Sequence, residues 1–166
     1  MEYRGKAHKF GDDVNTDYII SGKYKFKTLD MRELAKHVME DLDPDFYSKV
    51  TAGDFIVAGS NFGCGSSREQ APLAILNAGI GAVLAKSFAR IFYRNAINTG
   101  LLVVECDTNQ IDPGDDLELN LSSGVIKNLT RGVDIPVKPL PAVMIKILQD
   151  GGLAAHFRKY GGFNLD

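Results

Sequence analysis

The sequence predicts an α/β fold in which a parallel sheet with helical crossovers carries an added layer of antiparallel strands. Three short apolar runs, at residues 55–58, 82–85 and 101–105, lack polar alternation, which is typical of strands covered on both faces. Segments with helical spacing of apolar residues separate these runs, so strands and helices alternate along the chain. Beyond residue 110, turn signals recur at short intervals and residues 117–121 alternate strictly, which favours antiparallel hairpins.

The first part of the chain is expected to begin with a strand over residues 2–10 and a turn over 11–13. A helix is predicted over 29–41, because Asp30 can cap its first turn and Glu33 stands at the capping-box position. Pro44 excludes the helical conformation for the residue before it and so ends this helix. A short helical turn over 46–50 then leads into the strand at 55–58.

The middle of the chain is expected to form a helix over 71–78, ended by Gly79. Its start is open, because Pro72 favours a start near residue 70, whereas Ser66 and Glu69 have capping-box spacing for a start at 66. The strand at 82–85, a helix over 87–98 and the strand at 101–105 follow. A last helix over 141–148 and a further turn over 153–160 complete the prediction.

Composition and charge restrict the class of protein. A chain of 166 residues with 45% hydrophobic and 24% charged residues is expected to fold as a single globular domain, residues 1–166. A net charge of −2 argues against a nucleic-acid surface. The sequence contains no apolar run long enough to cross a membrane, and residues 1–6 lack the apolar core of a signal peptide. We therefore expect a cytoplasmic protein without membrane or nucleic-acid partners.

The two cysteines exclude a metal site built from thiolates of this chain. Cys64 and Cys106 cannot supply the four ligands of an iron–sulfur or structural zinc site, so we expect no metal here. Cys106 lies in an apolar strand and is expected to be a buried small residue. A nucleophilic Cys64 would need a histidine partner, and the three histidines, His8, His37 and His156, lie far from it in sequence.

The segment from Gly59 to Glu69, here called the glycine loop, is the strongest functional signal. Its glycines allow the backbone to adopt positive φ and to approach a ligand closely. The helix start that follows offers free N–H groups to an anion. Ser66 and Ser67 add hydroxyl groups, and Arg68 adds a guanidinium fork that suits a carboxylate. The loop therefore predicts a site for a small carboxylate or phosphate beside a reactive hydroxyl.

A second charged segment, residues 86–90, follows the next predicted strand. Ligands of parallel sheets bind outside the carboxyl ends of the strands, so Lys86 and Arg90 are expected near the glycine loop. The alternative is that Lys86 is a solvated charge and Arg90 lies on a helix face. Asp12, Asp13 and Asp17 are interpreted as turn and capping residues, because a second group of metal ligands is missing.

Basic and aromatic residues alternate from Lys23 to Lys27. Such alternation occurs in surfaces that stack on single-stranded nucleic acid. The patch is short and the chain is mildly acidic, so we favour a loop that presents side chains to a small acid.

Three motifs in fixed order together resemble the small subunits of the aconitase superfamily. They are Asn15-Thr16-Asp17, the glycine loop Gly59-x-Asn61-Phe62-Gly63-x-Gly65-Ser66-Ser67-Arg68-Glu69, and Lys86-Ser87-Phe88-Ala89-Arg90. The resemblance extends from Gly5 to about Tyr160 and is strongest to the branch that contains the 3-isopropylmalate dehydratases and homoaconitases. It implies a swivelling β/β/α domain. It also implies a separate large subunit, as partner, that carries a [4Fe–4S] cluster.

The resemblance further implies a reaction and roles for individual residues. The reaction is reversible dehydration and rehydration of a 2-hydroxy di- or tricarboxylic acid, which in the isopropylmalate branch serves leucine biosynthesis. By motif position, Ser66 corresponds to the catalytic base, Arg68 binds a substrate carboxylate and Ser67 helps to bind it. The supporting residues are Thr16, Asp17, Asn61, Gly63, Gly65, Lys86 and Arg90. Activity is expected only with the large subunit.

The family's substrate-selecting segment aligns with residues 24–27. Relatives of the homoaconitase type have Tyr-Leu-Arg-Thr there, and this chain has Tyr24, Lys25, Phe26 and Lys27. An apolar Phe26 at the arginine position favours an isopropyl or methyl group over a third carboxylate, although Lys25 and Lys27 flank it. Gln70 replaces a histidine found in many relatives. The alternatives are small subunits of homoaconitase or of citramalate, methylmalate or dimethylmalate dehydratases, and a non-enzymatic anion-binding interaction module.

Overall fold

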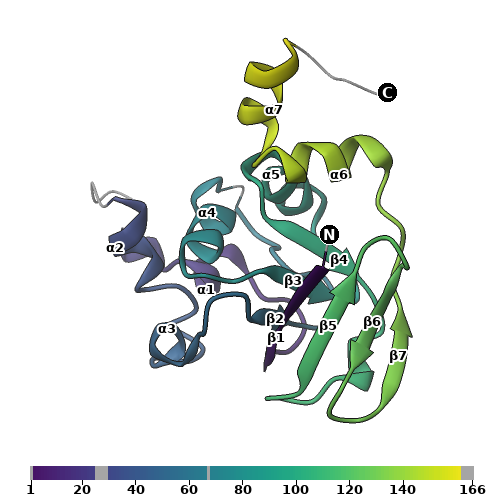
Figure 1. Ribbon diagram of the computed structural model, residues 1–166. Helices are drawn as coiled ribbons and strands as arrows, with labels where there is room; N and C mark the ends of the chain where they lie inside the picture. The colour runs from purple at the N-terminus through teal and green to yellow at the C-terminus, as the bar shows by residue number, and fades with distance from the viewer. Residues whose placement is uncertain (1, 25–29, 67, 162–166) are drawn as a thin grey trace.

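A computed structural model describes residues 2–24, 30–66 and 68–161 and confirms the predicted α/β fold. Within these residues, seven strands form one sheet in the order β4-β3-β2-β1-β5-β6-β7. The strands are β1 (Glu2–Lys9), β2 (Phe55–Val57), β3 (Ala82–Ala85), β4 (Leu102–Glu105), β5 (Asp116–Asn120), β6 (Val125–Asn128) and β7 (Val133–Pro136). The sheet curls, with its antiparallel end turned away from the helices (Figure 1).

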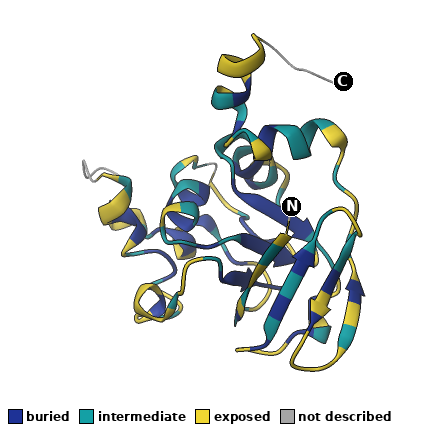
Figure 2. Ribbon diagram, in the orientation of Figure 1, coloured by how far each residue is buried: buried dark blue, intermediate teal, exposed yellow. Residues whose placement is uncertain are grey.

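The parallel part of the sheet contains the buried centre of the molecule. Strands β2, β3 and β4 pair in parallel, with Ile56 opposite Val83 and Val83 opposite Val103. Helices α4 (Gln70–Asn77) and α5 (Arg90–Thr99) connect these strands. Dark blue, fully buried segments follow the three strands in Figure 2. Because both faces of these strands are covered, polar alternation is absent from their sequence.

Strand β1 joins the parallel and antiparallel parts. Its first five residues pair antiparallel with β5, and its last three pair parallel with β2. Strands β5, β6 and β7 then continue as a meander in which Leu117, Leu119 and Ile126 face the core. The antiparallel strands thus extend the same sheet through β1.

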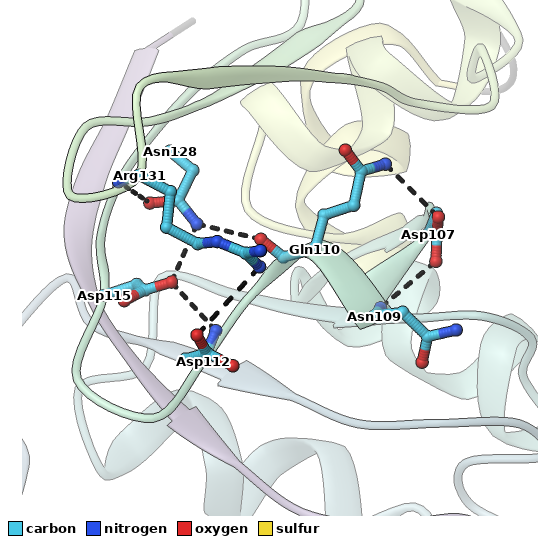
Figure 3. Close-up of polar contacts among 7 residues, drawn as sticks. All are labelled: Asp107, Asn109, Gln110, Asp112, Asp115, Asn128 and Arg131. Carbon is cyan, nitrogen blue, oxygen red and sulfur yellow. Dashed lines mark hydrogen bonds and ion pairs between the residues drawn. The ribbon is translucent and has the colours of Figure 1, made fainter.

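A buried polar network attaches the segment after β4 to this meander (Figure 3). Asp115, which is 5% exposed, accepts hydrogen bonds from the backbone N of Asp112 and from Asn128 Nδ2, both at 2.8 Å. Asn128 also donates to the carbonyl of Gln110 at 3.0 Å and accepts from the backbone N of Arg131 at 3.1 Å. Neither the Asp115 nor the Asn128 side chain therefore has a buried polar atom without a hydrogen-bond partner within the described residues. This is expected, because an unpaired buried polar group is costly.

The remaining helices differ from the prediction in instructive ways. They are α1 (Thr16–Ile19), α2 (Met31–Ala35), α3 (Phe46–Lys49), α6 (Ala142–Gln149) and α7 (Leu153–Tyr160), with 3-10 turns η1 (Gly22–Tyr24) and η2 (Thr108–Gln110). The prediction of one helix over 29–41 is wrong, because α2 ends at Ala35 and turns follow. Met39 takes φ of 59° and its N donates to the carbonyl of Ile19 at 2.9 Å, which a continuing α-helix does not allow.

Three other helix boundaries have physical causes. Helix α4 starts at Gln70, which agrees with the alternative based on Pro72. Helix α5 starts at Arg90 and not at 87, because Phe88 forms a parallel bridge with Phe62. Residues 153–160 form the full helix α7, which is held by His156, fully buried and 2.8 Å from Asp150. None of the helices in the described ranges is long and apolar enough to cross a membrane.

Candidate active site

The glycine loop and the segment after β3 lie side by side at the carboxyl edge of the sheet. The backbone N of Lys86 donates to the carbonyl of Gly59 at 3.0 Å. The N of Phe62 donates to the carbonyl of Ser87 at 3.0 Å, and the N of Ala89 donates back to Phe62 at 2.9 Å. The sheet order brings these two segments together because β2 and β3 are neighbouring parallel strands.

The loop after β1 supports the glycine loop from the other side. Gly63 N donates to the carbonyl of Val14 and Thr16 N donates to the carbonyl of Cys64, both at 2.8 Å. Gly63 has φ of 83° and a Cβ there would collide with the ring of Phe92, so only glycine fits. Three loops from β1, β2 and β3 therefore fix the path of the backbone that leads to Ser66.

Ser66 lies exposed at the end of the glycine loop, and its backbone is held by Thr16. Thr16 Oγ1 donates to the carbonyl of Ser66 at 2.8 Å, and Thr16 itself is 1% exposed. The hydroxyl of Ser66 has no hydrogen-bond partner among the described residues. Its backbone is fixed while its hydroxyl stays available to a ligand, which is the arrangement that a reacting group requires.

Asn61 stabilises the start of the same loop. It adopts left-handed φ of 61°, a conformation that asparagine tolerates better than most residues. Its Nδ2 donates to Asp13 Oδ1 at 3.1 Å, and its backbone N donates to Ser87 Oγ at 2.8 Å. Asp13 and Asp12 thus act as loop-fixing residues, since Asp12 Oδ1 also accepts from the N of Ser60 at 2.7 Å. This agrees with their interpretation as turn and capping residues.

Arg68, near the end of the glycine loop, has a guanidinium group of which only some donors have hydrogen-bond partners. Its Nη2 is 2.6 Å from Asp17 Oδ1 and its Nη1 donates to the carbonyl of Ile20 at 3.3 Å. The Nε atom is buried and has no hydrogen-bond partner among the described residues, and the side chain is 12% exposed. A buried donor without a partner is costly, so an acceptor supplied by a ligand would gain free energy here.

Ser66 and Arg68 share a cavity of about 300 Å³. Its lining combines polar and apolar residues and consists of Thr16, Gly63, Gly65, Ser66, Arg68, Ala89, Arg90, Ile91 and Phe92. The volume is at the lower end of small-molecule sites, which suits a compact acid with a short alkyl branch. A larger cavity of about 660 Å³ lies along β1, beside His8 and Asp54, but none of the three motifs contributes to it.

Several predicted site residues lie elsewhere. Lys86 is exposed and does not line the cavity, whereas Arg90 does. Tyr24 packs against His37 and Glu40. Ser67, Lys25, Phe26 and Lys27 lie outside the described residues, so their predicted roles stay predictions.

The cysteines show no catalytic arrangement in the described ranges. Cys64 forms a backbone bridge with Asn15, and the contacts of the three described histidines do not include it. Burial, with a smaller effect of the Asp107 charge, raises the pKa of the Cys106 thiol to about 12. Cys106 is therefore protonated at neutral pH. No group of three or more histidine, cysteine, aspartate or glutamate side chains in the described part of the chain could hold a metal ion.

Sequence reasoning missed residues that shape the site. The carbonyl of Ile20 orients Arg68, and backbone acceptors carry no residue-type signal. Ile91 lines the cavity although it is 52% exposed. A large apolar residue directly after Arg90, at the start of a helix beside the motif, was the available signal.

Comparisons with known proteins identify the family to which the chain is similar. The family model of the aconitase C-terminal domain matches residues 14–109, which span all three motifs. The 3-isopropylmalate dehydratase small subunit 2 of Archaeoglobus fulgidus is 58% identical over 99% of this chain and 100% of its own. The methanogen homoaconitase small subunit of Methanothermobacter thermautotrophicus is 54% identical over 94% of this chain and 91% of its own.

A solved structure gives the same result for the fold. The crystal structure of 3-isopropylmalate dehydratase from Methanocaldococcus jannaschii superimposes with a TM-score of 0.94 at 50% identity, over 97% of this chain and 96% of that one. The family match, the near full-length relatives and this superposition agree with one another. The chain belongs to the aconitase C-terminal domain family, among its dehydratase small subunits.

Proposed function

We propose that the chain is the small subunit of a heteromeric 3-isopropylmalate dehydratase, which interconverts 2-isopropylmalate and 3-isopropylmalate by dehydration and rehydration in leucine biosynthesis. The single observation that carries this proposal is the shared cavity of Ser66 and Arg68, in a chain that is 58% identical to a relative of that name. We further propose that residues 1–166 act as one swivel domain and that the enzyme is cytoplasmic.

Arg68 is proposed to bind a carboxylate of the substrate. Asp17 contacts Nη2 and the carbonyl of Ile20 accepts from Nη1, which leaves the buried Nε to donate to an acceptor of the substrate. A carboxylate bound there gains a charge-assisted hydrogen bond and relieves the unpartnered donor. Ser67, the next residue toward Ser66, is proposed to add a hydroxyl contact to the same group.

Ser66 is proposed to remove the proton from the substrate carbon while the hydroxyl on the adjacent carbon leaves. A serine hydroxyl is a weak base in water, so the surroundings must favour its alkoxide form. Arg68 and Arg90, which line the same cavity, supply positive charge for this purpose. Thr16 fixes the backbone of Ser66 at the cavity wall. On rehydration, Ser66 returns the proton.

The remaining chemistry is proposed to come from the large subunit. A [4Fe–4S] cluster bound there would supply a Lewis acid for the leaving hydroxyl group. The part of this chain that the structure describes offers Ser66, Arg68 and Arg90 but no group of metal ligands. The chain is therefore expected to be inactive without its partner.

The apolar part of the cavity favours isopropylmalate over larger acids. Ala89, Ile91 and Phe92 supply apolar lining in the same cavity and can accept an alkyl branch. The second candidate is a homoaconitase-type reaction, because a methanogen homoaconitase small subunit is 54% identical. A tricarboxylate would require a further cation, for which Arg90 is available in the cavity.

A reconstitution assay tests the proposal. The chain, its large subunit and the mixture are each assayed with isopropylmalate, homocitrate and citramalate under the same conditions. We expect turnover only in the mixture, with the highest kcat/KM for isopropylmalate. Equal activity of the isolated chain would contradict the need for a partner, and a preference for homocitrate would favour the second candidate.

A further inference from the structure

A cluster of three side chains lies at the end of η1, where the predicted substrate-selecting segment begins with Tyr24, and its other two members, His37 and Glu40, have no assigned role in the reaction. The ring of Tyr24, 9% exposed, stacks on His37 with centroids 4.2 Å apart and planes at 23°. Tyr24 OH donates to Glu40 Oε1 at 2.8 Å, and His37 Nδ1 donates to Glu40 Oε2 at 2.8 Å. We call these three residues the Glu40 clamp.

Glu40 is the centre of the clamp because both of its oxygens are used. Lys23 Nζ also lies 3.5 Å from Oε1, so hydroxyl, imidazole and ammonium groups converge on one carboxylate. Burial raises the pKa of Glu40, but the hydrogen bonds from His37 and Tyr24 outweigh it and hold the pKa below its usual range. The carboxylate is therefore ionised at neutral pH and can accept all three contacts.

The clamp is connected to the candidate active site through described residues. Next to Glu40, Met39 N donates to the carbonyl of Ile19 at 2.9 Å. The following residue, Ile20, accepts from Arg68, and Asp17 in the same segment pairs with Arg68. Residues 16–24 are thus fixed at Thr16 by the glycine loop, at Ile19 by Met39 and at Tyr24 by Glu40.

We propose that Glu40, through His37 and Tyr24, is a positioning residue for substrate binding, because it fixes the segment whose Asp17 and Ile20 orient Arg68. The inference rests on the proposed function and deepens it. Glu40 does not line the cavity of Ser66 and acts only through the segment that it holds. Release of Tyr24 would free residues 20–24 while Thr16 and Ile19 stay fixed. The carbonyl of Ile20 would then hold Arg68 less firmly, whereas the backbone of Ser66 would stay held by Thr16.

The test uses the reconstituted complex with isopropylmalate. Glu40→Ala is expected to raise KM about tenfold, the effect of losing hydrogen bonds to a charged group. The fall in kcat should be smaller than the rise in KM, because Arg90, the other positive charge that lines the cavity, is not held by this segment. Tyr24→Phe keeps the ring stacked on His37 and removes one hydrogen bond, so it should raise KM less and fold in any case. Glu33→Gln is the control, because the exposed side chain of Glu33 in α2 pairs with Lys36 at 2.9 Å and, within the described ranges, makes no contact with the clamp.

A second measurement does not depend on activity. Trypsin cleaves after lysine, and the isolated chain of Glu40→Ala should be cut after Lys23, which lies next to Tyr24, several times faster than wild type or Glu33→Gln. Unchanged KM in both clamp variants, with an active wild-type complex, would overturn the inference. An inactive wild-type complex would instead count against the proposed function. In that case, trypsin cleavage of Glu40→Ala at the wild-type rate would still overturn the inference about the Glu40 clamp.

Discussion

Thr16 and Thr108 provide a matched pair for testing whether the loop after β1 serves catalysis. Each is 1% exposed and donates one hydrogen bond from Oγ1 to a backbone carbonyl. Thr16 donates to Ser66 at 2.8 Å and Thr108 donates to Ala58 at 2.7 Å. Thr→Val at either position keeps the shape of the side chain and leaves one carbonyl without this donor, a part-buried carbonyl at Ser66 and a buried one at Ala58.

The magnitude follows from the loss of that hydrogen bond. A buried acceptor that loses its partner costs about 1–3 kcal/mol. For a chain of this length, each kcal/mol lowers Tm by about 2–4 °C, so both variants should melt about 4–8 °C lower if the cost is near 2 kcal/mol. Calorimetry or circular dichroism of the isolated chain measures this loss. Thr108→Val should lose at least as much stability as Thr16→Val, because the carbonyl of Ala58 is buried and that of Ser66 is only part-buried.

The two variants should differ in catalysis. Thr16→Val releases the backbone of Ser66, and a displacement of about 1 Å at a reacting group can cost on the order of 100-fold in rate. We therefore expect kcat of the reconstituted complex to fall at least about tenfold in Thr16→Val and to stay near wild type in Thr108→Val. Assays are run well below the melting temperature of either variant. Equal kcat values in the two variants would refute the reasoning.

Two further predictions concern stability. Gly63 and Gly114 both have φ of 83°, but a Cβ at Gly63 would collide with Phe92 and one at Gly114 would meet open space. Gly63→Ala should therefore lower Tm clearly more than Gly114→Ala, which carries only the backbone strain of about 1–2 kcal/mol. Equal losses of Tm would mean that the contact with Phe92 does not contribute to the cost. Burial raises the pKa of Asp54, but hydrogen bonds from His8 and two backbone N–H groups outweigh it and hold the pKa below its usual 3.8. The stability that ionised Asp54 contributes is present above that pH and is lost as the pH falls through the lower pKa of the folded state. Asp54→Asn should lower Tm at pH 7, and the difference in Tm between this variant and wild type should become smaller below pH 3.8. A difference in Tm that does not change with pH would contradict this link between ionisation and stability.

The parallel strands were predictable because their signal is local. The run at residues 82–85 matches β3 to the residue, and those of β2 and β4 match within one residue. A continuous apolar run preceded by glycine can satisfy burial on both faces only as an internal strand or a buried helix, and its shortness favours a strand. The position of both functional segments at one sheet edge followed from this strand order.

The helix boundaries were less predictable because distant contacts set them. The turn at Met39 depends on the carbonyl of Ile19, and the late start of α5 depends on the bridge between Phe62 and Phe88. Neither contact leaves a periodic pattern in the sequence around the boundary. Local capping signals at Asp30 were correct, since Asp30 Oδ1 accepts from Glu33 N at 2.8 Å.

The candidate site was predictable in composition but not in its pairings. The spacing of Ser66 and Arg68 indicated a cradle for an acid, and the motif order located Thr16 and Asp17 near it. The sequence could not show that Asp17 pairs with Arg68, because an ion pair between distant loops depends on how the loops pack. It also could not show that Tyr24 would be buried against His37 and Glu40.

The most direct test of the central claim is the turnover of Ser66→Ala in the complex reconstituted with the large subunit. If this chain supplies the base, kcat for isopropylmalate should fall by about 10²- to 10⁴-fold, the usual contribution of a positioned general base. KM should change little, because Arg68 and its partners stay in place. Ser48→Ala on α3, whose hydroxyl donates to Asp45, serves as control and should keep full activity. Retention of kcat in Ser66→Ala would contradict the account and would leave the chain as a non-catalytic interaction subunit.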